Sequence, residues 1–116
     1  MGIFSKKPAY NVIDLSNSHM ELVVYKKQLL EFNANKIKVL LFNAKGTEKE
    51  RLQKAYIDVR YANPKVTDEI NNIDNEIAKV LDDLKLLYAR RVRSELTISN
   101  KINNLLELIQ QRQALE

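Results

Sequence analysis

The hydrophobic and polar positions from Thr67 to Glu116 repeat with the period of a helix that packs along one seam. Apolar residues step by three and four positions, which is the a/d pattern of a coiled-coil heptad. This pattern predicts long helical structure over the whole C-terminal half. The first part of the seam consists of Ile70, Ile73, Ile77, Val80, Leu84 and Leu87, and the second part, in a shifted phase, of Ile98, Ile102, Leu105 and Ile109.

The two parts of the seam are separated by 11 residues, from Leu87 to Ile98. One heptad plus four residues is a stutter, which unwinds a supercoil locally without ending the helix. Because no Gly or Pro follows Pro64, the pattern favours one continuous helix over residues 67–116. The alternative is a break near Ser99, with Ser99 as the cap of a fourth helix.

An earlier helix is predicted to start at a capping box, in which Ser18 accepts from the amide three residues on and Glu21 reaches back. It continues to about Ala44 and ends at Gly46, because glycine readily adopts the left-handed conformation that closes a helix. The apolar run at residues 39–42 is expected to be buried from several sides. Its apolar stripe consists of Leu22, Tyr25, Leu29 and Phe32, with Val23, Leu30 and Ile37 beside it at steps of seven.

A second capping box at residues 47–50 predicts a shorter helix over about residues 48–62. Pro64 ends it, because the residue before a proline disfavours the helical conformation. The next helix is capped either by Asn63, with Pro64 in its first turn, or by Thr67.

The predicted fold class is therefore all-α. A helical hairpin (about 18–44 and 48–62) packs on a long helix (about 67–116) with coiled-coil character, or a four-helix bundle forms if the chain breaks near Ser99. Residues 18–116 are expected to form a single helical domain.

Residues 1–15 show no helical period and predict an extended, basic and apolar arm, which docks on a neighbouring surface or remains a flexible end. Its apolar contacts are expected to be Ile3, Phe4 and Tyr10, with Lys6 and Lys7 between them. One short wedge of this kind is only a marginal lipid anchor, so peripheral membrane contact is not the favoured interpretation.

The composition narrows the classes of function. With 2 Gly, 2 Pro and 45% apolar residues in 116, the chain suits a helical domain better than a sheet. The absence of cysteine excludes disulfides and thiol chemistry. No apolar run is long enough for a transmembrane helix or a secretion signal, so we expect a cytoplasmic or virion protein. The abundance of Asn, Lys and Ile, whose codons are AT-rich, favours a low-GC bacterium or its phage.

The residue pattern gives little support for an enzymatic function. His19 is the only histidine, and no partner that would orient it as a base is identified. Glu69, Glu76 and Asp83 recur at steps of seven, about 10 Å apart along a helix, which is too far to share a metal ion. We therefore expect a non-enzymatic protein without a catalytic residue, cofactor or metal.

The net charge of +4 is unevenly placed: residues 67–89 are acidic, and an arginine cluster follows at once. The guanidinium group of arginine can donate two parallel hydrogen bonds to a phosphate or carboxylate group. The candidates for contact with nucleic acid or an acidic partner are therefore Arg90, Arg91 and Arg93, together with Lys6 and Lys7. The alternative is that the arginines pair with acids on a neighbouring helix and determine its register.

Helix lengths predict association. An unbroken helix over residues 67–116 is about 75 Å long, whereas the helices of the hairpin are about 40 and 22 Å long and cannot cover it. Apolar side chains left uncovered favour association by roughly 1.5–3 kcal/mol each. The interface expected with a second copy or a protein partner consists of Ile98, Ile102, Leu105, Leu106 and Ile109.

We therefore expect a structural or scaffolding protein that oligomerises through helix–helix (coiled-coil) contacts, as a phage or virion-associated component would. One alternative is a nucleic-acid- or membrane-surface-binding protein that uses the N-terminal arm and the arginine cluster. Another is a small adaptor or inhibitor of one host protein.

Overall fold

The computed structural model describes residues 12–90 and 94–116, with side chains from residue 19 onward. This part of the chain contains four helices and no strand, which confirms the all-α prediction. The C-terminal half follows the four-helix alternative. The helices are α1 (Val12–Leu41), α2 (Thr47–Arg60), α3 (Asp68–Ala89) and α4 (Glu95–Leu115).

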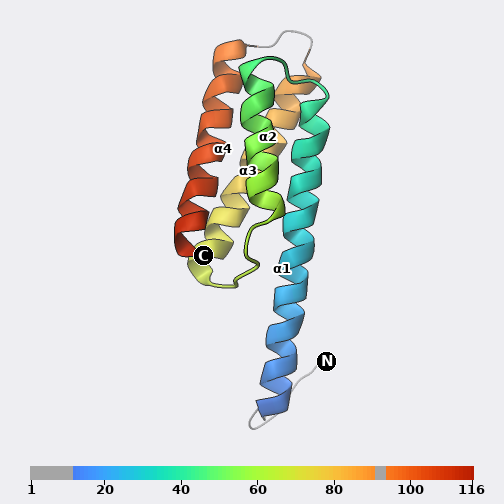
Figure 1. Cartoon of the computed structure of the whole chain (residues 1–116), viewed down its shortest axis with the longest axis vertical. Helices are drawn as coiled ribbons and strands as arrows, with labels where there is room; N and C mark the ends of the chain where they lie inside the picture. The colour runs from blue at the N-terminus through green and yellow to red at the C-terminus, as the bar shows by residue number, and fades with distance from the viewer. Residues whose placement is uncertain (1–11, 91–93) are drawn as a thin grey trace.

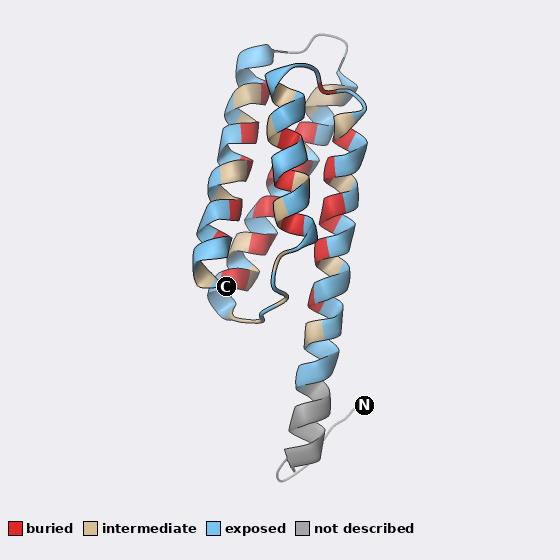
Figure 2. Ribbon diagram, in the orientation of Figure 1, coloured by how far each residue is buried: buried red, intermediate tan, exposed pale blue. Residues whose placement is uncertain are grey.

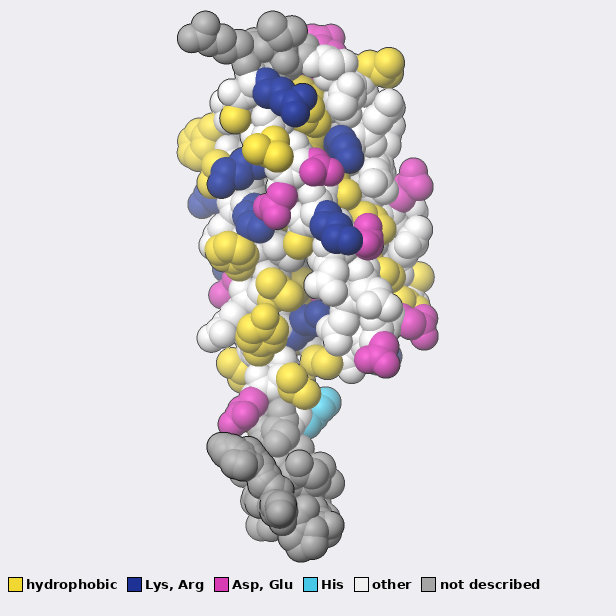
Figure 3. Space-filling view, turned by 180° about the vertical axis from the view of Figure 1, so that it is seen from behind, with side chains coloured by type: hydrophobic (Ala, Val, Ile, Leu, Met, Phe, Trp, Pro, Cys, Tyr) yellow, Lys and Arg dark blue, Asp and Glu magenta, His cyan; other side chains and the backbone are white. Residues whose placement is uncertain are grey.

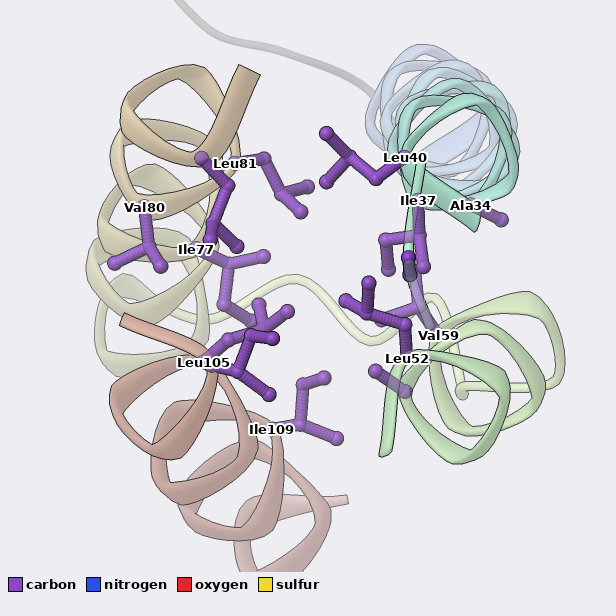
Figure 4. Close-up of a cluster of buried hydrophobic side chains, with 14 of the residues drawn as sticks. Ala34, Ile37, Leu40, Leu52, Val59, Ile77, Val80, Leu81, Leu105 and Ile109 are labelled. Carbon is purple, nitrogen blue, oxygen red and sulfur yellow. The ribbon is translucent and has the colours of Figure 1, made fainter. Parts of the chain in front are cut away.

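The helices run alternately up and down and occupy the four corners of a bundle (Figures 1 and 4). α1 and α4 each pack against both α2 and α3, so α1–α4 and α2–α3 are the diagonal pairs. Residues 61–67 therefore connect two diagonal corners, and the fold consists of two helical hairpins, α1–α2 and α3–α4, packed side by side.

The N-terminal part of α1 extends past the end of the bundle (Figure 1). α1 has 30 residues and is about 45 Å long, whereas α2 has 14 residues and is about 21 Å long. Among residues 19–25 of this overhang, Val23 is half-buried and the others are exposed (Figure 2).

The core lies along the bundle axis, where all four helices place aliphatic side chains at heptad spacing (Figures 2 and 4). Each fully buried aliphatic side chain contributes roughly 1.5–3 kcal/mol relative to an exposed one. Residues with at most 4% exposure include Leu30, Ile37 and Leu40 of α1, Leu52, Ala55 and Val59 of α2, Ile77, Leu81 and Leu84 of α3, and Ile98, Ile102, Leu105 and Ile109 of α4.

Side-chain caps define the starts of α3 and α4. The Thr67 hydroxyl accepts from the Ile70 amide at 3.2 Å, which confirms the Thr67 alternative for the start of α3. The Ser94 hydroxyl accepts from the Thr97 amide at 3.3 Å. Gly46 has a positive φ of 57°, but with ψ of −130° it does not have the conformation that closes a helix, and it directly precedes α2 rather than following the last turn of α1.

The prediction of one continuous C-terminal helix is wrong. α3 ends at Ala89 and α4 starts at Glu95, so the chain breaks before Ser94 rather than at Ser99. Ser99 lies inside α4, where its hydroxyl accepts from Arg51 Nη1 at 3.2 Å. The reversal lets the second part of the seam pack inside the same molecule, which removes it from water without a partner.

The predicted start of the first helix is also wrong, because α1 begins at Val12 rather than at Ser18. Residues 12–15, assigned to an extended arm, are helical. Ser and Glu inside a helix cost at most about 0.7 kcal/mol each, so a sequence typical of a cap does not force a helix to start. The rest of the predicted arm, residues 1–11, lies outside the described residues.

Candidate functional site

Of the apolar positions identified along the first helix, Leu30 and Ile37 are buried, whereas the stripe beside them lies largely on the surface. Leu22, Tyr25 and Phe32 are 50%, 64% and 58% exposed, and Leu29 is half-buried. The same heptad spacing continues through the half-buried Lys36 to the exposed Val39. These residues form what we call the outer stripe: Leu22, Tyr25, Leu29, Phe32, Lys36 and Val39.

The core face of α1 contains Leu30 and Ile37 but is less apolar overall than the outer stripe. Both rows follow heptad spacing, and they lie roughly 100° apart around the helix. The core row also includes Lys26 and Asn33, 4% and 2% exposed, so hydrophobicity alone does not show which of the two rows is buried. The prediction that residues 39–42 are buried from several sides is also wrong, since Leu40 is buried but Val39 and Phe42 are 57% and 84% exposed.

The outer stripe borders the groove between the parallel helices α1 and α3. A hollow of about 240 Å³ in this groove is lined on the α1 side by Leu22, Tyr25, Lys26 and Leu29. Its opposite wall consists of Val66, Asn71 and Asn75. The groove therefore has one mostly apolar wall and one amide-rich wall. In Figure 3, apolar side chains gather over α1, while cations and carboxylates alternate across the middle of the same face.

Lys36 is the charged member of the outer stripe. Its Nζ lies 3.2 Å from Asp82 Oδ1 of α3 and 4.9 Å from the centroid of the Phe32 ring. The ammonium group thus bridges the two walls of the groove, and its aliphatic stem keeps the stripe continuous toward Val39.

A buried ionic cluster holds the base of the overhang. Asp74 of α3 accepts from Lys26 Nζ of α1 at 2.6 Å and from Arg112 Nε of α4 at 2.7 Å. Arg112 Nη1 also donates to the Asn63 carbonyl at 3.0 Å and to Glu116 Oε2 at 2.8 Å. These bonds join three helices and residues 61–67 at the end of the bundle from which α1 emerges.

The sequence predictions did not include this cluster, although the sequence carries a signal for it. Asp74 follows Ile70 by four positions and precedes Ile77 by three, so it occupies a core position of α3. Arg112 follows Ile109 by three positions on α4. Charged residues that continue a buried heptad row predict an ion pair, because an unpaired charge in the core is strongly unfavourable.

The residues expected to form an oligomer interface on the C-terminal helix lie inside the bundle. Ile98, Ile102 and Leu105 are 0% exposed and Ile109 is 3% exposed, while Leu106 is half-buried. The premise of that expectation, an apolar stripe without a partner in the same chain, therefore does not hold.

The predicted cationic cluster is only partly described. Arg90 is exposed at the end of α3, next to a shallow hollow that Asp83 and Lys101 also line. Lys101 Nζ pairs with Asp83 Oδ2 at 2.9 Å. The remaining candidates lie outside the described residues: Arg91, Arg93, Lys6, Lys7, and the arm residues Ile3, Phe4 and Tyr10.

Further observations bear on metal binding and membranes. His19 is exposed on the overhang. Across residues 12–90 and 94–116, no three His, Asp or Glu side chains lie close enough together to hold a metal ion. None of the helices in these ranges is both long and apolar enough to cross a bilayer.

No known protein family, curated protein or solved structure matches this chain. Function must therefore be inferred from the surface itself, and the outer stripe is the most distinctive feature of that surface.

Proposed function

We propose that this protein is a non-enzymatic assembly component that binds an α-helix along the outer stripe. The observation that supports this function is the exposure of Tyr25 and Phe32, 64% and 58%, within a row at heptad spacing. Apolar residues spaced in this way on an exposed helix are the contacts by which one helix docks against another.

The area of the stripe supports a binding role. A fully exposed aromatic side chain presents roughly 150–250 Å². Monomeric proteins rarely expose contiguous apolar patches above a few hundred Å² unless the patch has a function. Asn71 and Asn75 on the opposite wall supply the polar rim that is typical of protein interfaces.

This proposal retains the assembly function expected from the sequence. It places the binding surface on α1, whereas the sequence pattern predicted it on the helix that contains Ile98 and Ile109. Helical scaffolds of this kind suit a cytoplasmic assembly or a virion equally.

The charge distribution favours a protein partner over phosphate. Several of the described surface cations pair with acids, as in Lys54–Asp58 at 2.8 Å and Arg60–Glu31 at 3.2 Å. Phosphate-binding proteins instead gather basic residues on one face.

Photo-crosslinking tests the proposed function. p-Benzoylphenylalanine replaces Phe32 in the outer stripe or, as the control, Ile57, which is 55% exposed on α2. After irradiation in cells that produce the protein, we expect the probe at Phe32 to form a defined adduct with a helical segment, identified by mass spectrometry. The control should form none. If the two positions give the same adducts, or if neither gives any, the outer stripe is not a binding surface.

A further inference from the structure

We propose that the helix bound to the outer stripe is α1 of a second copy of this chain, running antiparallel. The two-fold axis passes between Leu29 and Phe32. This inference rests on the proposed function and specifies its partner. With this axis, Leu22 faces Val39 of the second copy, and Leu29 faces Phe32 of the second copy.

Lys36 determines the direction of the pairing. In a parallel, in-register pair, Lys36 would face Lys36 of the second copy in a desolvated seam, where like charges repel. In the antiparallel pair it faces Tyr25 of the second copy, because residues whose numbers sum to 61 lie opposite each other. An ammonium group over an aromatic ring is attracted to it. In the single chain, Lys36 already lies over the Phe32 ring, at 4.9 Å from its centroid. The cation therefore contacts an aromatic ring in the monomer and in the antiparallel dimer.

Charges at the two ends of the stripe favour the same direction. Glu21 is exposed beside the start of the stripe, and Lys38 and Lys45 are exposed near its end. An antiparallel pair brings Glu21 of each copy toward the basic end of the other. A parallel pair brings like charges together at both ends.

The exposed area agrees with what a stable dimer needs. Aromatic side chains present roughly 150–250 Å² when fully exposed. On this scale the exposed fractions of Leu22, Tyr25, Phe32 and Val39 amount to roughly 350–570 Å² of surface per copy. An interface of standard size buries about 800 Å² per partner, of which about 57% is apolar. The outer stripe therefore supplies about the apolar area of one half of such an interface, and a two-fold contact uses the same patch on both copies.

Disulfide trapping tests the inference, because the chain has no cysteine. Two single-cysteine variants are made, Leu22→Cys and Val39→Cys, both at exposed positions. In the antiparallel pair these two positions face each other, whereas each lies roughly 25 Å from its own counterpart, beyond the 7 Å between Cα atoms that a disulfide spans. We expect the mixture to form a cross-linked dimer under mild oxidation and each variant alone to form none. A mixture of Leu22→Cys with Leu96→Cys, exposed on α4, is the matched control and should not cross-link.

The outcomes separate this inference from the proposed function. Cross-linking of each variant with itself would show a parallel pair and overturn the inference. If the mixture fails to cross-link while the probe at Phe32 forms an adduct with a different protein, the inference is wrong and the proposed function stands. If the mixture does not cross-link and the probe at Phe32 forms no adduct, both the inference and the proposed function are wrong.

Discussion

Asp74 of α3 and Arg112 of α4 face each other across the bundle, with 2.7 Å between Oδ1 and Nε, and both side chains are only 2% exposed. Lys26 of α1 completes the contact from the other side. Because each ion costs several kcal/mol to remove from water, the two cations can occupy the interior only around this carboxylate. The geometry of the ionic cluster therefore determines how α1 leaves the bundle and where the outer stripe is presented.

Asp74→Asn should destabilise the protein severely. The variant keeps the shape of the side chain but leaves Lys26 and Arg112 without the carboxylate between them. Removal of one partner from a buried ion pair lowers the free energy of unfolding by about 3–5 kcal/mol. Urea denaturation followed by circular dichroism measures the loss.

Asp58→Asn is the matched control. Asp58 pairs with Lys54 on the surface of α2, and the lysine side chain is 68% exposed. Such i,i+4 pairs contribute about 0.3–0.5 kcal/mol, so this variant should unfold close to the wild type. Equal stability of the two variants would show that the buried cluster does not hold the helices together.

Ile102→Ala tests whether the α4 seam belongs to the core of the single chain. Ile102 is fully buried, so we expect the free energy of unfolding to fall by about 2–5 kcal/mol and the molar mass in solution to stay the same. Leu96→Ala, at a site 73% exposed, should change neither quantity. If Ile102→Ala instead lowers the molar mass with little loss of stability, α4 forms an intermolecular interface and the bundle assignment fails.

The sequence predicted the C-terminal seam correctly but not the partner of that seam. Heptad spacing depends on local residues, so the core positions Ile98 to Ile109 could be identified in advance. Whether they pack within one chain depends on the reversal of direction between α3 and α4. The cap of α4 is Ser94, whereas the predicted cap was Ser99. The choice depends on the energy of the whole bundle, which a local pattern does not contain.

The candidate site was harder to predict. The apolar row from Leu22 to Phe32 could be identified from its spacing, and so could Leu30 and Ile37 beside it. Spacing alone does not show which row is buried, because the buried row also includes Lys26 and Asn33. Lys26 can occupy the core because Asp74, on a helix far along the chain, lies opposite its ammonium group. Ion pairs between distant segments are therefore the information that local periodicity lacks.

Substitution of Ser94 tests the position of the break. Ser94→Ala removes the hydroxyl that accepts from the Thr97 amide, and loss of an N-cap costs about 0.5–2 kcal/mol. Ser94→Gly should cost only a few tenths of a kcal/mol, since glycine is tolerated at this position. At Ser99, inside α4, the order should reverse, because glycine in a helix interior is about 1 kcal/mol worse than alanine. Thermal unfolding of the four variants checks this crossed pattern, and the same order at both positions would contradict it.

Asn33→Leu should stabilise the protein. Asn33 is 2% exposed in the core row of α1, and its Oδ1 accepts no hydrogen bond from the residues that the structure describes. An unsatisfied buried polar group costs about 1–3 kcal/mol, and the leucine side chain has the same branched shape as asparagine, with bulkier methyl groups in place of the amide atoms. We expect urea denaturation to show a gain of about 1 kcal/mol, whereas Asn35→Leu at an exposed site of the same helix should change stability little. A loss of stability in Asn33→Leu would mean that the amide has a structural role in the core.

Lys36→Leu tests the role of the charge in the outer stripe. The substitution makes the row continuously apolar and removes the cation that disfavours parallel pairing, so self-association should tighten by about tenfold or more, or roughly 1.4 kcal/mol. It should also allow a parallel pair, so that Leu22→Cys in the Lys36→Leu background cross-links with itself. Lys27→Leu, at an exposed position on the face of α1 away from the outer stripe, is the control and should leave the orientation unchanged. Sedimentation equilibrium measures the affinity. Equal affinities for the wild type and Lys36→Leu would show that Lys36 does not face the second copy and that the stripe pairs in another register.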